Sequence, residues 1–261
     1  MESKSITRII RSTIHIVMTD ADTLLPKGLG SACIVRYQDT NVLLTVAHVT
    51  NVEAATCLFT GQPVKNNQTP LYSVGAMNYL ETFDIIKFED QLLKLQENSG
   101  KKEEIDFGLV DFSYVIIGDN VKLLQRKTDL GTFTIKAGKK SIIQSNLTDI
   151  PKSDTEYGFF GRIKPLMIRG TPTADTFETQ EVFYSGLRFI REIKNYYEFE
   201  LLQPIKSNAD FKGTSGAPIM DKDGNLVSLV THGYEGGTKI YGIALSKFRS
   251  GVEATILLQR N

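Results

Sequence analysis

A serine, a histidine and an aspartate occupy local surroundings that suit acyl transfer. Ser215 lies between two glycines in the segment 213–216 (Gly-Thr-Ser-Gly), which leaves little bulk around its hydroxyl. Because glycine adopts backbone angles that other residues avoid, such a turn can aim two backbone N–H groups at one point beside the hydroxyl. An oxyanion would form there if Ser215 attacked a carbonyl carbon. The turn favours Ser215 as a nucleophile, although glycine and serine also fill ordinary turns.

His48 and Asp106 border two other apolar stretches. His48 ends the apolar segment 42–47, which predicts a strand buried on both faces, so its imidazole either reaches a cleft or is a core histidine bonded to a carbonyl. Asp106 opens the apolar stretch 105–112, where a charge is costly unless it is hydrogen-bonded. A histidine N–H is one natural partner for this carboxylate, and a strand edge facing water is the alternative.

Acyl transfer needs the three roles that these residues offer. Ser215 would be a nucleophile that needs a base, and His48 would take its proton and later return it to the leaving amine. Asp106 would hold the other ring nitrogen and stabilise the imidazolium. Asp84 and Asp111 are the next carboxylates to consider for this third role.

Three short segments carry a resemblance to the trypsin-like (chymotrypsin-fold) serine peptidases. The segment 45–48 (Thr-Val-Ala-His) resembles the Thr-Ala-Ala-His block of that family, and 105–109 resembles its Asp-(Ile/Leu)-Ala-Leu block, with Gly108 in place of alanine. The segment 213–218 resembles the family's block around the serine. The chain order His, Asp, Ser is the one found on double barrels of this kind. The resemblance implies an oxyanion hole made by the backbone N–H groups of Gly213 and Ser215.

The fold expected from this resemblance is all-β, with two six-stranded antiparallel β-barrels and the active site in the cleft between them. Residues 1–120 are expected to form the first barrel, with an insertion at 83–104 that carries a short surface helix, and 121–261 the second. Strand-forming residues dominate 6–17, which predicts an early strand, and a short C-terminal helix is expected from Ser246 onward.

Specificity is the part of the site where alternatives stay open. The resemblance implies that segments 207–212 and 230–237 wall the primary pocket. His232 matches the place where glutamyl endopeptidases hold a histidine, and it could hydrogen-bond a carboxylate or an amide. Asp210 would instead favour lysine or arginine, or pair with His232 and raise its pKa. The full set of pocket candidates is Asp210, Lys212, His232, Gly233 and Tyr234.

Regulation is expected to differ from that of zymogen-activated relatives. Those enzymes carry an aspartate before the serine, which pairs with a newly cut N-terminal amine, whereas this chain has Thr214. That switch should therefore be absent, and an activating protein partner in a microbial signalling or defence system is one way to control the enzyme. The alternative is a catalytically weak or silent domain that binds proteins, with 83–104 and 170–180 as docking segments.

Composition narrows the classes of partner and the compartment. With 30 basic and 30 acidic residues the formal net charge is 0, which gives no reason to expect nucleic acid or a membrane surface as partner. The N-terminal sequence lacks the apolar region of a signal peptide, which favours the cytoplasm unless a leader has been removed. The two cysteines, Cys33 and Cys57, have no metal-ligand spacing. The expected partner is a protein or peptide substrate, and no cofactor or metal is implied.

Overall fold

The computed structural model describes most of the chain. The described residues are 1–20, 22–23, 25–63, 71–81, 84, 86–87, 89–90, 93–94, 108–131, 133–169 and 175–260. Asp106 and most of the expected insertion at 83–104 lie outside them, as does 170–174 of the segment 170–180. Within the insertion, the described residues Ile86, Lys87, Glu89, Asp90, Leu93 and Lys94 are helical, in keeping with the expected short helix.

The first half of the chain forms an eight-stranded sheet with the order β5-β4-β1-β2-β3-β7-β6. Its neighbours pair antiparallel, except for β12 (Ile143–Gln144), which pairs parallel with β2. Runs of apolar and β-branched residues account for these strands, and β1, β3 and β7 are buried along nearly their whole length. The other strands are β1 (Thr13–Thr19), β2 (Pro26–Tyr37), β3 (Thr40–Thr45), β4 (Ala55–Phe59), β5 (Leu71–Ser73), β6 (Asn78–Tyr79) and β7 (Ser113–Ile117).

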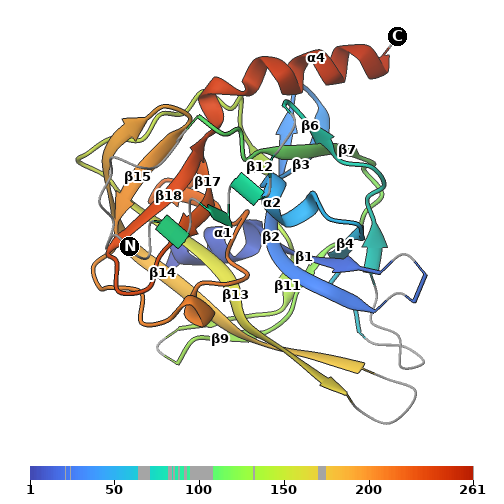
Figure 1. Ribbon diagram of the computed structural model, residues 1–261, viewed down its shortest axis with the longest axis horizontal. Helices are drawn as coiled ribbons and strands as arrows, with labels where there is room; N and C mark the ends of the chain where they lie inside the picture. Colours follow the sequence, from blue (N-terminus) through green and yellow to red (C-terminus); the bar gives the residue numbers. More distant parts are fainter. Residues whose placement is uncertain are drawn as a thin grey trace.

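The second half forms a closed barrel with the order β13-β14-β15-β18-β17-β16 (Figure 1). The expected all-β, chymotrypsin-like architecture is therefore confirmed. The first half differs from a closed barrel, because its described strands form a sheet that is open between β5 and β6. The barrel strands are β13 (Glu156–Arg169), β14 (Asp175–Ile193), β15 (Tyr196–Glu200), β16 (Pro218–Asp221), β17 (Leu226–Gly233) and β18 (Lys239–Ala244).

Two small ribbons connect the halves. The strand β8 (Leu124–Gln125) pairs with β11 (Gly138–Lys139), and β9 (Thr128–Asp129) pairs with β10 (Thr134–Ile135). None of these four strands belongs to the closed barrel.

The strands β13 and β14 continue past the barrel as a two-stranded arm, which Figure 1 shows reaching away from the body of the molecule. The β14–β15 pairing begins only at Arg188, so the earlier part of β14 pairs with β13 alone within the described chain. One edge of that part of β14 is therefore outside any described sheet pairing.

The N-terminal segment is a helix, α1 (Ser3–Ser12), where the sequence analysis predicted a strand over 6–17. The prediction is wrong up to Ser12, and the strand β1 begins only at Thr13. Ile6, Ile9 and Ile10 have the spacing of one helix face, and Ile9 and Ile10 are completely buried. Burial of that face outweighs the β preference of isoleucine.

The two terminal helices each pack on the half that lies farther away in sequence. The Ser5 hydroxyl in α1 donates to the carbonyl of Lys222, and Arg8 donates to that of Asp223, both in the turn after β16. At the other end, the Tyr114 hydroxyl of β7 donates to the carbonyl of Gly251 in α4 (Arg249–Arg260), at 3.1 Å. The C-terminal helix was expected from the sequence.

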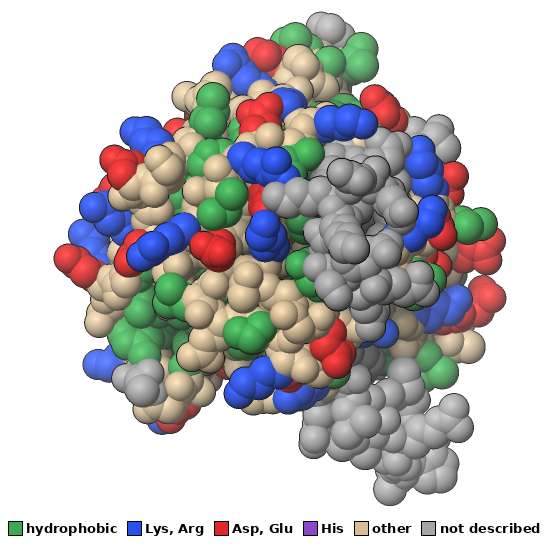
Figure 2. Space-filling model, turned by 60° about the vertical axis from the view of Figure 1, so that its left-hand side comes forward, with side chains coloured by type: hydrophobic (Ala, Val, Ile, Leu, Met, Phe, Trp, Pro, Cys, Tyr) green, Lys and Arg blue, Asp and Glu red, His purple; other side chains and the backbone are tan. Residues whose placement is uncertain are grey.

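Charged side chains of both signs are interspersed over the face shown in Figure 2, with hydrophobic ones in small groups between them. Among the described residues, no helix is long and apolar enough to cross a membrane.

Candidate active site

His48 lies in the one-turn helix α2 (Ala47–Thr50), directly after the buried strand β3. Its backbone N–H donates to Oδ1 of Asp111 at 2.9 Å, and its ring Nδ1 lies 2.8 Å from Oδ2 of the same carboxylate. Asp111 is completely buried, whereas the His48 side chain keeps 16% of its surface exposed. The ring is therefore held by a desolvated carboxylate and still reaches solvent.

The carboxylate beside His48 is Asp111, and this corrects the prediction of Asp106. Asp106 lies outside the described residues. The Asp111 carboxylate accepts from the backbone N–H of His48 and also lies against its ring Nδ1. The sequence repeats the same local pattern, an apolar residue, aspartate and phenylalanine, at 105–107 and at 110–112. Asp111 has the better position because it comes just before β7, which pairs directly with β3, the strand that leads into the helix of His48.

Ser215 lies in the turn before β16, and a hydrogen-bonded connection ties that turn to the first half of the chain. The Ser31 N–H donates to the backbone carbonyl of Ser215 at 2.8 Å, and the Ser31 hydroxyl donates to the carbonyl of Gly213 at 2.9 Å. The Thr45 hydroxyl in turn donates to the Ser31 carbonyl at 2.7 Å. Because Thr45 stands three residues before His48, this connection sets the serine turn against the strand that carries the histidine.

The glycines around Ser215 are required by backbone angle and by space. Gly213 has φ +104° and Gly216 has φ +86°, in the region that favours glycine. A Cβ on Gly213 would lie 2.3 Å from the carbonyl oxygen of Arg162, and one on Gly216 would lie 1.9 Å from that of Ser31. Within the described chain, no hydrogen bond from the N–H of Gly213 or Ser215 to a protein acceptor is present. Both donors can therefore serve an oxyanion.

The Ser215 hydroxyl donates to the backbone carbonyl of Thr231 at 3.1 Å. Thr214 is completely buried, and its hydroxyl donates to the carbonyl of Phe211 at 2.8 Å. The position that holds an aspartate in zymogen-activated relatives is thus filled here by a residue that stabilises the turn internally.

Asp210 and His232 do not pair with each other. Lys164 lies 2.7 Å from the Asp210 carboxylate, and this contact holds the pKa of Asp210 below its usual value. His232 is buried, with Nδ1 2.9 Å from the Thr231 hydroxyl and its ring stacked on Tyr241 at 4.8 Å. Burial lowers the pKa of His232 to about 3, against the partial opposing effect of Asp111, so the raised pKa expected from Asp210 is wrong. The Asp111 carboxylate is therefore close enough for its charge to act on the imidazole of His232.

The expected pocket walls are connected by backbone hydrogen bonds around Ile205. The Ile205 N–H donates to the carbonyl of Gly237 at 2.9 Å, and the Gly236 N–H donates to that of Ile205 at 2.8 Å. Ile205 is 2% exposed, and its Cδ1 lies 2.6 Å from where a Cβ on Gly233 would stand. The side chain of Ile205 therefore fills the space beside Gly233.

The remaining pocket candidates contribute less to this space. Lys212 is exposed, and the Tyr234 ring lies over Gly237, 2.3 Å from the position of an added Cβ. Ile205 lies just outside the predicted wall, which began at residue 207.

No cluster of histidine, cysteine, aspartate and glutamate that could hold a metal ion is present among the described residues. Cys33 and Cys57 are buried free thiols, and burial raises the pKa of Cys33.

No family model matches the sequence, and no curated protein matches it. Solved structures, by contrast, match the structure of this chain. A serine endoprotease from Yersinia pestis has 13% identity and a TM-score of 0.51, and the match covers 97% of this chain but only 66% of that one. HL collagenase has 12% identity and a TM-score of 0.52, with 96% and 95% covered. An inactivated protease paralogue of the scabies mite, S-D1, has 10% identity and a TM-score of 0.56, with 96% and 94% covered. At these identities the likeness shows the fold, which is that of the trypsin-like serine proteases.

Proposed function

We propose that the chain is a serine endopeptidase that hydrolyses peptide bonds through an acyl-enzyme, with Ser215, His48 and Asp111 as its catalytic residues. The observation that carries this proposal is the pair of hydrogen bonds from His48 to the buried Asp111, at 2.9 and 2.8 Å. A buried carboxylate that accepts from both the backbone and the ring of one histidine fixes the orientation of that ring. In a trypsin-like fold, this is the role of the third catalytic group.

The proton path follows from this pairing. With Asp111 accepting at Nδ1, the favoured neutral tautomer carries its proton on Nδ1, so Nε2 holds the lone pair that a general base needs. His48 would take the Ser215 proton as the hydroxyl oxygen attacks the scissile carbonyl, and the developing imidazolium would face the Asp111 carboxylate. The proton then passes to the leaving amine, and water repeats the sequence to release the acyl group.

The oxyanion would bind at the N–H groups of Gly213 and Ser215. The glycine backbone angle at 213, and the Arg162 carbonyl that leaves no room for a Cβ there, support a turn that holds its shape before substrate arrives. Removal of one such donor costs about 2.7–4 kcal/mol of transition-state stabilisation in known cases.

Substrate preference is proposed to be for small, uncharged P1 side chains. Ile205 fills the space beside Gly233, Asp210 is paired with Lys164, and His232 is packed against Tyr241. The pairing of Asp210 with Lys164 offsets the charge that would attract lysine or arginine, and the space that Ile205 occupies favours a short side chain. Restricted specificity would follow from this small pocket.

The second candidate is a catalytically silent domain that binds proteins. The observation that favours it is the hydrogen bond from the Ser215 hydroxyl to the Thr231 carbonyl, because this bond engages the proton that a general base must take. One similar structure is described as an inactivated protease paralogue.

A fluorophosphonate probe distinguishes the two. The proposed enzyme should be labelled, whereas Ser215→Ala and His48→Ala proteins should not. Absence of labelling in a folded wild-type protein would leave the silent domain as the better account.

A further inference from the structure

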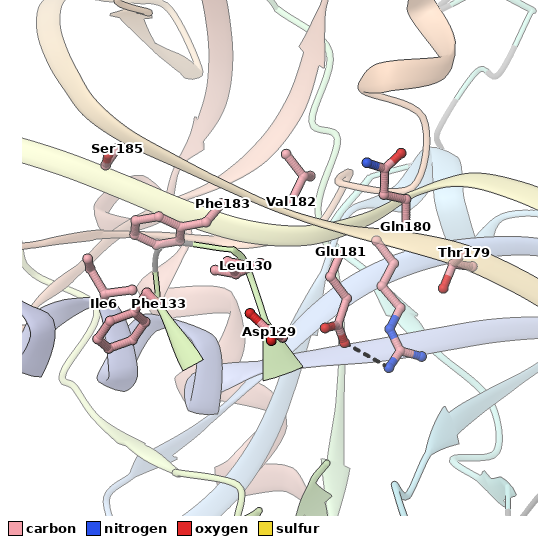
Figure 3. Close-up of a pocket in the computed structure, with 11 residues that line it drawn as sticks. Ile6, Asp129, Leu130, Phe133, Thr179, Gln180, Glu181, Val182, Phe183 and Ser185 are labelled. Atoms are coloured by element: carbon pink, nitrogen blue, oxygen red, sulfur yellow. Dashed lines mark hydrogen bonds and ion pairs between the residues drawn. The ribbon is translucent and has the colours of Figure 1, made fainter. Parts of the chain in front are cut away.

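A groove of about 990 Å³, whose lining does not include Ser215, lies between the β13–β14 arm, the β9–β10 turn and the helix α1 (Figure 3). Its walls come from three separate parts of the chain, so it is a feature of the tertiary fold. The lining residues are Ile6, Asp129, Leu130, Phe133, Arg162, Thr179, Gln180, Glu181, Val182, Phe183 and Ser185.

The groove follows the open edge of β14. Consecutive residues 179–183 all line it, although successive side chains of a strand point to opposite faces. The alternate residues 179, 181, 183 and 185 share one face of β14, and the lining by 180 and 182 between them brings the backbone of β14 into the wall. Among the described residues, this part of β14 pairs with β13 alone, because its pairing with β15 begins at Arg188. Such an edge offers N–H and C=O groups to another strand.

One end of the groove is apolar. Ile6, Leu130, Phe133 and Phe183 are partly buried hydrophobic residues packed against the core, and they gather at one end of the view in Figure 3. An apolar side chain of a bound strand would find contacts here that water does not provide.

Charged groups line the groove beyond these apolar residues. Arg162 and Glu181 lie 3.1 Å apart and neutralise each other. Asp129 is exposed, and within the described chain its carboxylate has one hydrogen bond, from the N–H of Gly131 at 2.9 Å. The groove therefore has one excess negative charge, which suits a basic side chain.

We propose that this groove binds an extended, basic and apolar peptide segment of a partner protein as an added strand along the edge of β14. The backbone of the segment pairs with β14, an apolar side chain lies at Ile6, Leu130, Phe133 and Phe183, and a lysine or arginine faces Asp129. Strand addition of this kind gives affinity through the main chain and specificity through alternate side-chain pockets.

The test uses a phage-displayed library of random ten-residue peptides, selected on the Ser215→Ala protein so that cleavage removes no ligand. Selected peptides are then synthesised, and their Kd values are measured by fluorescence anisotropy. We expect alternating sequences with apolar and basic residues. Methylation of alternate backbone nitrogens of the peptide should weaken binding by at least about tenfold, because it removes the donors that pair with a strand edge.

Asp129→Lys is the matched protein variant, and it should also weaken binding by about tenfold or more. Asp154→Lys makes the same charge change at an exposed residue outside the lining and should change the Kd by less than about twofold. Peptides that bind Asp129→Lys and wild type equally, or tolerate methylation, would overturn the proposal, as would a selection that enriches no peptide. Because the measurement is binding to a protein without its serine, its outcome is independent of whether the chain is a protease.

Discussion

His48 and Asp111 are joined by two hydrogen bonds, one from the backbone N–H of the histidine and one at its ring Nδ1. The carboxylate therefore fixes both the start of α2 and the orientation of the imidazole. A single substitution at Asp111 therefore disturbs both.

Asp111→Asn should reduce the turnover number by about 10⁴ while the protein stays folded, because an amide can present an N–H to Nδ1 and favour the wrong tautomer. Turnover is measured with an ester or peptide substrate that the wild type cleaves, and folding by circular dichroism. Asp106→Asn serves as the control and should remain close to the wild type. An equal loss at position 106 would show that the assignment of Asp111 is wrong.

The sequence allowed some of this site to be predicted because some of its signals are local. A few neighbouring residues are enough to recognise the glycine turn at 213 and 216, and the same is true of the apolar strand that ends near His48. Asp106 and Asp111 share the same neighbours in sequence, so only the pairing of β7 with β3 distinguishes them. The helix α1 was predicted as a strand because its isoleucines have β preference, and packing of one face overrode that preference.

Ile205 was missed for a related reason. Its contact with Gly233 joins residues on separate strands and loops, and no local pattern shows that an isoleucine before the serine turn lies beside a glycine after the next hairpin.

Ile205→Ala should widen the range of P1 residues that are accepted, because truncation opens space beside Gly233. Cleavage of a P1 library should show new activity toward residues such as leucine and phenylalanine. The control is Ile150→Ala, which truncates an exposed isoleucine. Strong cleavage after lysine or glutamate by the wild type would contradict the proposed preference. Labelling by fluorophosphonate shows separately whether the protein has an active serine, so a wrong preference is distinguished from an inactive protein.

Gly216→Ala should destabilise the protein far more than Gly75→Ala. Both glycines have positive φ, +86° and +77°, so each alanine carries a backbone penalty of about 1–2 kcal/mol. Only the Cβ at 216 meets other atoms, the carbonyl of Ser31 at 1.9 Å, whereas none lies within 4 Å at Gly75. Urea unfolding of the two variants measures the difference. Equal losses would mean that the serine turn and the first half do not pack as closely as described.

The wild-type protein should lose stability as the pH falls from about 7 to 5, in part because of His232. Its pKa of about 3 in the folded protein lies below the ordinary value of 6.5, so the unfolded chain binds the extra proton in this range. The contribution of one such group between pH 7 and pH 5 is about 2 kcal/mol.

The measurement is urea unfolding at both pH values, compared with His232→Gln, which cannot titrate. The variant should show a smaller difference between the two pH values, while His15, whose pKa is also lowered by burial, continues to contribute in both proteins. An unchanged pH dependence in the variant would contradict the assignment.

The crossed packing of α1 and α4 makes each half of the chain depend on a helix supplied by the other. A cut in the connection between the halves would leave α1 attached to the first sheet but lying on the second barrel, and α4 attached to the barrel but lying on the sheet. Two fragments separated there should be poorly soluble alone and should reassemble when mixed, with each delivering the helix that the other lacks. The same crossing makes this connection a suitable place for a split-protein reporter.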